Sequence, residues 1–147
     1  MEKAPDFDYT KVPNGYVHCF HHDCPRASEC LRHLTGLNIP ADVQTVRCVS
    51  PSAWPTAADK CPHYRSVQKV TLAWGTSHMA EEVPYKQAIA IRRAIRRLWP
   101  KTTFFRISHH ERPITPDMQE MIARIFARKA PDAQPRYDYL TEEYDFS

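Results

Sequence analysis

Glycine is scarce in this sequence, and the catalytic motifs that depend on it are missing. Only three of the 147 residues are glycine, whereas thirteen are proline, so proline marks most of the turns. No Gly-x-Ser-x-Gly element, P-loop or dinucleotide-binding fingerprint is present, and no His-Glu-x-x-His motif occurs either. These absences argue against the corresponding hydrolases, nucleotide-binding enzymes and metalloproteases. We nominate no catalytic residue and expect a protein that is not an enzyme.

Long apolar runs are also missing. The N-terminus lacks the apolar core of a secretion signal, and no run approaches the length of a membrane-spanning helix. We therefore expect a cytoplasmic protein with no membrane partner. Stable disulfides are disfavoured in that compartment, so clustered cysteines favour metal binding or redox chemistry. The count of five cysteines agrees, because an odd number cannot pair completely.

The net charge of +3 is too mild to predict nucleic-acid binding by itself, but the charges are unevenly distributed. Acidic residues end the chain at Glu142, Glu143 and Asp145. Basic residues of one predicted helix form a cluster, called the arginine block below: Arg92, Arg93, Arg96 and Arg97. Such a block is compatible with phosphate or nucleic-acid contacts, and equally with a solvated helix face balanced by an acidic tail.

Cysteine and histidine are concentrated in the first half of the chain. The cysteines of interest are Cys19, Cys24, Cys30 and Cys61, and the histidines are His18, His21, His22, His33 and His63. Thiolate and imidazole are the side chains that bind zinc and iron–sulfur centres. Residues 17–33 contain few apolar side chains, so a metal would organise a region with little core of its own. We therefore predict an N-terminal metal-binding knuckle.

The spacing of these cysteines sets a condition on the local structure. In one continuous helix, Cys24 and Cys30 would be separated by roughly 9 Å along the axis. Two thiolates that bind one tetrahedral ion cannot lie that far apart. Shared ligation therefore requires a turn at residues 24–27 with a helix that starts near Ser28, and Pro25 is compatible with that turn.

Two ligand sets satisfy this condition. Cys30 and His33 would share one face of a helix, which allows a local set. That set consists of Cys19, Cys24, Cys30 and His33. We prefer Cys61 as the fourth ligand, because it opens a Cys-Pro turn and would join a distant loop to the knuckle. The histidines that then become candidates for hydrogen bonds to the sulfurs, or for alternative ligands, are His18, His22, His33 and His63.

Zinc is the metal that the sequence favours. The rim of the predicted site is rich in histidine, and no ferredoxin-like series of cysteines occurs. An iron–sulfur cluster is the alternative cofactor, and it would colour the pure protein brown. A third interpretation needs no metal, because cysteines also act as small buried apolar residues or form adventitious disulfides. Cys48 lies in a predicted strand and is interpreted as a core residue.

The periodicity of apolar residues predicts alternating short elements. Helices are expected at 28–35 with Gly36 as C-cap, at 85–99, and at 116–128 with Thr115 as N-cap. Strands are expected at three places that are rich in β-branched or aromatic residues, namely 43–49, 67–74 and 102–107.

These elements indicate a single α+β domain over residues 1–147. We expect a small mixed sheet of about three strands, two main helices and the N-terminal Cys/His-rich metal knuckle. The predicted subdivision is a knuckle at 17–65 that includes the first strand, an α/β core at 66–130, and an extended aromatic and acidic tail at 131–147.

Two further groups of residues carry candidate chemistry. His109, His110 and Glu111 form a polar turn that suits a general base, a phosphate clamp or a second metal site, and equally a plain exposed turn. The aromatic residues that would stack on bases are Trp54, Tyr64 and Trp74. The function class predicted is a metal-stabilised binding or regulatory module whose partner is a protein or a nucleic acid. The alternative is an iron–sulfur redox protein or a small metalloenzyme.

Motifs along nearly the whole chain occur in the order of a known family. They are Cys19…Cys24-Pro25…Cys30, Cys61-Pro62-His63-Tyr64-Arg65, Phe104-Phe105-Arg106, Arg112-Pro113-Ile114-Thr115-Pro116 with Gln119, and Glu142-Glu143-Tyr144-Asp145-Phe146. In this order the chain resembles a family of small bacterial proteins catalogued only as a domain of unknown function. The resemblance implies no activity, but it groups Cys61 with the first three cysteines and leaves Cys48 out. It also places His110 in a turn where relatives are expected to have glycine.

Overall fold

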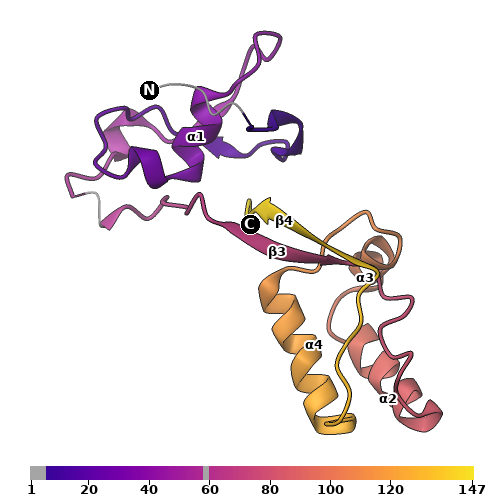
Figure 1. Cartoon of the computed structure of the whole chain (residues 1–147). Helices are drawn as coiled ribbons and strands as arrows, with labels where there is room; N and C mark the ends of the chain where they lie inside the picture. Colours follow the sequence, from indigo (N-terminus) through magenta and orange to yellow (C-terminus); the bar gives the residue numbers. More distant parts are fainter. Residues whose placement is uncertain (1–5, 58–59) are drawn as a thin grey trace. The chain divides into compact units, whose positions relative to one another are not determined.

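The computed structural model describes residues 6–57 and 60–147, which form two compact units (Figure 1). Unit 1 comprises the described part of Met1–Lys69 together with Tyr144–Ser147, and unit 2 comprises Val70–Glu143. The described residues contain four α-helices and two sheets of two strands each, so the fold is mixed α+β. The predicted single sheet of about three strands is wrong, whereas the two predicted main helices correspond to the two longest helices of the described residues.

Unit 1 is built from short elements. Strand β1 (Val17–His18) pairs in parallel with β2 (Arg47–Cys48), and helix α1 (Leu31–Leu37) is the one α-helix of the described part of this unit. The described part of the unit also contains three 3₁₀ turns, which are η1 (Tyr9–Lys11), η2 (Ala27–Glu29) and η3 (Pro51–Ala53). Of the strand predicted at 43–49, only Arg47–Cys48 forms. The segment begins in a turn, in which the Pro40 carbonyl accepts from the Val43 N–H.

Helix α1 begins later than predicted and contains the glycine that was expected to end it. Its N-cap is Cys30 and its C-cap is Asn38, whose side-chain amide donates to the Leu34 carbonyl at 2.7 Å. At Gly36, a Cβ atom would lie 2.8 Å from the Cys19 carbonyl oxygen and 3.3 Å from the Phe20 ring. Gly36 is thus required for close approach of the Cys19 segment rather than for a cap.

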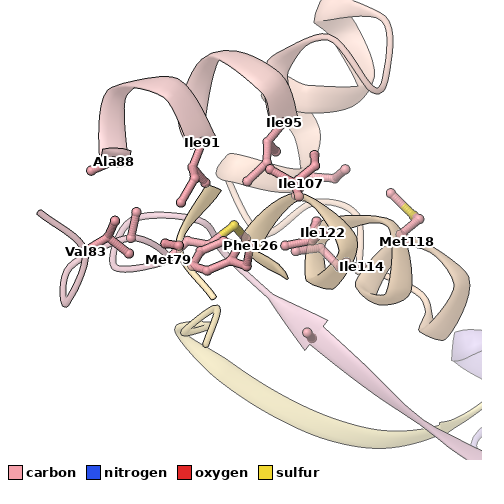
Figure 2. Close-up of a cluster of buried hydrophobic side chains, with 14 residues drawn as sticks. Met79, Val83, Ala88, Ile91, Ile95, Ile107, Ile114, Met118, Ile122 and Phe126 are labelled. Atoms are coloured by element: carbon pink, nitrogen blue, oxygen red, sulfur yellow. The ribbon is translucent and has the colours of Figure 1, made fainter. Parts of the chain in front are cut away.

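Unit 2 has the larger core. Its helices are α2 (Tyr85–Arg96), α3 (Lys101–Ser108) and α4 (Pro116–Lys129). Figure 2 shows Ile91 and Ile95 of α2 facing Ile122 and Phe126 of α4 across a cluster of 14 buried residues. The apolar stripes of α2 and α4 therefore meet each other, as their periodicity predicted.

The helices at 85–99 and 116–128 are confirmed, with small changes at their ends. Helix α2 ends at Arg96 instead of Trp99. Helix α4 has the predicted N-cap, since the Thr115 hydroxyl accepts from the backbone N–H of Met118.

The predicted strand at 102–107 is wrong, because the chain there forms α3. Pro100 is the N-cap of this helix. In a strand, Phe105 and Ile107 would lie on the same face, but the helix buries Ile107 completely and leaves Phe105 54% exposed. β-branched and aromatic residues made the segment resemble a strand, and packing of Ile107 into the core overrides that propensity.

The extended tail contains a strand that is paired. Strand β4 (Tyr139–Tyr144) bonds to β3 (Lys69–Trp74), which confirms the predicted strand at 67–74 (Figure 1). The Trp74 indole donates to the Thr141 hydroxyl at 2.9 Å, and the Thr71 hydroxyl donates to the Glu142 carboxylate at 2.6 Å. The two strands consequently run antiparallel.

Within the described ranges, no helix has both the length and the apolar character needed to span a membrane.

Candidate functional site

The four cysteines of the predicted knuckle line one small cavity in unit 1. Its volume is about 30 Å³. The cysteines that line it are Cys19, Cys24, Cys30 and Cys61. Each of them is a free thiol that is partly buried, so no disulfide joins them. Cys48 is exposed on β2 and is absent from this lining, and its predicted place in the core is wrong.

Local turns bring the cysteines to the cavity. The Cys24 carbonyl accepts from the Ala27 N–H at 3.0 Å, so residues 24–27 form the turn that shared ligation requires. Cys30 forms an antiparallel bridge with Ser66. Cys61 opens a second turn, in which its carbonyl accepts from the Tyr64 N–H at 3.3 Å. Three segments that are separate in sequence thus contribute cysteines to the lining of one cavity.

Arg32 holds these segments together, a role that no sequence pattern indicated. Its guanidinium donates to the His63 carbonyl at 2.7 Å and to the Val17 carbonyl at 2.9 Å. Its own carbonyl accepts from the Cys19 N–H at 2.9 Å. One side chain therefore fixes the loop of Cys61 against the strand that precedes Cys19. An arginine fits this task because its planar fork offers several donors at once.

The Cys19 thiol interacts electrostatically with the three other thiols of the cavity. Burial raises its pKa, and the nearby thiols of Cys30, Cys24 and Cys61 raise it further. The backbone N–H of His21 acts in the opposite direction, because it donates a hydrogen bond to the sulfur. Without a cation the neutral thiol is favoured, whereas a bound cation would favour the thiolate.

His33 is the most buried imidazole beside the cavity. It is only 2% exposed, and its Nε2 atom lies 3.0 Å from Nδ1 of His22. Burial lowers the pKa of His33, and the charge of His22 lowers it further. The Ala27 backbone acts weakly in the other direction, but within the described residues no hydrogen bond of normal geometry reaches the buried Nδ1 atom. His33 is thus a buried ring that lines the cavity and has one nitrogen without a regular hydrogen bond.

The other predicted histidines have different environments. His63 lines the cavity, as does His21, whose ring stacks on Trp54 at 4.2 Å. His22 and His18 do not line it. His18 is almost fully buried and has both nitrogens engaged, one with the Tyr9 hydroxyl and one with the Arg47 carbonyl. His18 therefore has a structural role between β1 and its neighbours.

Shared lining is not the same as a formed metal centre. Among the residues that the structure describes, no three Cys, His, Asp or Glu side chains are arranged to hold one ion. The cavity nevertheless combines four thiols with an imidazole nitrogen that lacks a regular bond. Thiolate and imidazole donors of this kind suit zinc, so the residues present fit the predicted ion by their chemistry. The assignment of ligands stays a prediction.

The arginine block lies on unit 2 in the second half of α2, with Arg97 as the C-cap of the helix. Its four guanidinium groups are exposed, and none of them is ion-paired within the described part of the chain. Other arginines of this unit do meet carboxylates, as Arg124 meets Glu120 at 2.6 Å and Arg136 meets Glu82 at 3.3 Å. A hollow of about 470 Å³ is lined by Ile89 and the whole arginine block.

Each of the predicted stacking residues contacts another ring or a guanidinium group. Trp54 stacks on His21, the Arg26 guanidinium lies 3.4 Å from the centre of the Tyr64 ring, and Trp74 stacks on Tyr139. The aromatic ring that is exposed beside the arginine block is Phe105. The incorrect strand prediction concealed the exposure of Phe105, because side chains two residues apart in a strand share one face, and Ile107 is buried.

In the polar turn at residues 109–111, one histidine forms a hydrogen bond with a carboxylate that is distant in sequence. His110 Nε2 lies 2.8 Å from one oxygen of Asp138, and His78 Nδ1 lies 3.2 Å from the other. His110 has a φ of 58°, a left-handed conformation that glycine adopts most easily. This backbone explains why relatives are expected to have glycine there.

We expect the Asp138 carboxylate to make the free energy of unfolding depend on pH in the acidic range. Burial alone would raise the pKa of Asp138, but hydrogen bonds from His110 and His78 outweigh it, and the pKa is lowered. A lowered folded-state pKa adds stability above the ordinary value of 3.8, and that stability is lost as the pH falls below it. We expect Asp138→Asn to reduce the urea midpoint at about pH 6 far more than at about pH 3. An equal reduction at both pH values would contradict this account.

Comparison with known proteins identifies the chain only at the level of its family. The sequence profile of a family of unknown function (DUF6078) matches residues 1–146, so the chain belongs to that family. No curated protein and no solved structure gives a match.

Proposed function

We propose that this member of the DUF6078 family is a cytoplasmic binding module whose unit 1 is organised by one zinc ion. The observation that carries the proposal is the convergence of four free thiols on one small cavity. The proposed ligands are Cys19, Cys24, Cys30 and Cys61. The cytoplasm is a compartment in which such thiols remain reduced and available to a metal.

The shortage of core in unit 1 supports a structural role for the ion. The buried apolar side chains of its described part are Tyr16, Ala27, Leu31 and Val49. Unit 2, by contrast, has a cluster of 14 buried residues. Small units that bury little apolar surface are commonly stabilised by a metal or by disulfides, and the cysteines here are free.

The size of the cavity favours a single ion over a cluster. A volume of about 30 Å³ has room for roughly one or two atoms or ions the size of a water molecule. An iron–sulfur cluster contains several iron and sulfide atoms and needs more room than this. Four thiolates also saturate tetrahedral zinc and leave no open position for substrate. The site is therefore suited to holding the fold rather than to catalysis.

The metal content of the protein tests this function. Protein purified without a metal-affinity column is expected to be colourless and to contain about one zinc ion per chain by elemental analysis. Iron with sulfide and a brown colour would replace the proposal with the redox alternative. Protein that folds with no bound metal would eliminate both.

A further inference from the structure

We propose that the arginine block and Phe105 together bind single-stranded nucleic acid. This inference rests on the proposed function, because it names the partner class of the binding module. It concerns unit 2 alone, whereas the zinc ion belongs to unit 1.

The first observation is a row of hollows that share Arg96 in their lining. The hollow of about 470 Å³ is lined by the arginine block and Ile89. A second, of about 280 Å³, shares Arg92 and Arg96 with it and adds the hydroxyl groups of Thr76 and Ser108. The Thr76 and Ser108 hydroxyl groups are already bonded to each other and to the Phe104 carbonyl, so the guanidinium groups are the donors that phosphate oxygens would accept from.

The second observation is an aromatic platform at the end of this row. A third hollow, of about 570 Å³, contains Arg96, Lys101, Phe105 and His109. The rings of Phe105 and His109 are stacked with their centres 3.9 Å apart, and Phe105 is 54% exposed. His109 Nδ1 donates to the Phe105 carbonyl at 2.8 Å, which fixes the orientation of the imidazole. The platform is thus held in place before a ligand arrives.

The platform rests on a rigid support. Ile91 and Ile95 anchor α2 in the core, and Ile107 anchors α3 there (Figure 2). Packing against the core therefore fixes the positions of both helices. The Arg96 guanidinium lies 5.8 Å from the centre of the Phe104 ring, which connects the basic and aromatic parts. Preorganised groups lose little freedom on binding.

This combination favours single-stranded nucleic acid over the other polyanions. An acidic protein segment would satisfy the arginines but would leave the ring stack without a matching group. A duplex would present phosphates, but its bases are already stacked on each other. Unpaired bases offer flat faces to aromatic rings, while the phosphates of the same strand contact the arginine block.

Fluorescence anisotropy with labelled oligonucleotides tests the inference on the full chain. The probes are a single strand of oligo(dU) and a mixed-sequence duplex of equal length, titrated at several salt concentrations. We expect tighter binding of the single strand. Arg92→Gln with Arg96→Gln should weaken it and reduce the slope of log K against log salt by about 1.4, because two phosphate contacts are lost.

Phe105→Ala tests the aromatic part separately. It should weaken single-strand binding about tenfold and leave the salt slope unchanged, because stacking releases no counterions. Phe105→Tyr should restore the affinity. Tyr85→Ala is the matched control, since Tyr85 is an exposed aromatic residue outside the three hollows.

The charge control removes two arginines from elsewhere on unit 2. Arg124→Gln with Arg136→Gln changes the net charge equally, but these residues are ion-paired away from the hollows. The inference is overturned if this control weakens binding as much as the block variant, if duplex binds as tightly as the single strand, or if the wild type binds no oligonucleotide at low salt. Zinc content measured on the same preparations reports on the proposed function separately.

Discussion

Replacing Cys61 by serine is expected to release the bound zinc and to unfold unit 1. A serine hydroxyl is a poor ligand for zinc, so only three thiolates would remain for an ion that takes four ligands. Thiolate-bound zinc contributes on the order of 10 kcal/mol to the folding of small domains. Losing even part of this exceeds the stability that a unit with so few buried apolar side chains can supply. Zinc analysis and thermal unfolding measure the two effects.

Cys48→Ser is the matched control for this prediction. Cys48 is exposed and does not line the cavity, so its replacement should keep the zinc and the melting temperature of the wild type. Equal loss of zinc from both variants would contradict the proposed ligands. If zinc is retained in Cys61→Ser but lost from His33→Gln, the local set that uses His33 is the correct one.

The helices with long periodic stripes were predictable from the sequence, whereas α3 and β4 were not. Helix α2 repeats apolar residues over several turns, and α4 adds the Thr115 cap, so local information suffices. Helix α3 has only eight residues, and the burial of Ile107 decides its structure. Strand β4 depends on β3, a partner about seventy residues away that no local pattern announces.

The candidate site shows the same division between local and distant information. The spacing of the cysteines indicated a turn at residues 24–27, and the structure has that turn. The roles of Arg32 and Asp138 were not visible, because their partners are distant in sequence. Arg32 bonds to carbonyls 15 and 31 residues away, and Asp138 bonds to histidines 28 and 60 residues away. A single sequence does not reveal contacts of this range.

Gly75→Ala is expected to be the most disruptive single-methyl change in unit 2. Gly75 has a φ of 80°, which costs a residue with a side chain roughly 1–2 kcal/mol. The added Cβ would also overlap the Asp138 carboxylate and the His110 imidazole, so the hydrogen bond between them must break. Adding a lost charge-assisted hydrogen bond gives a total of about 3 kcal/mol in the free energy of unfolding.

Gly15→Ala measures the free-energy cost of the backbone conformation without the steric overlap that Gly75→Ala adds. Gly15 has nearly the same φ, 77°, but the nearest atom to an added Cβ is 3.8 Å away, so only the backbone cost of about 1 kcal/mol is expected. Urea unfolding of both variants, and of Gly75→Ala combined with Asp138→Ala, measures the difference. Because the double variant lacks the carboxylate, Gly75→Ala should cost clearly less in that background. Full additivity of the two changes would show that the overlap with Asp138 is not the cause.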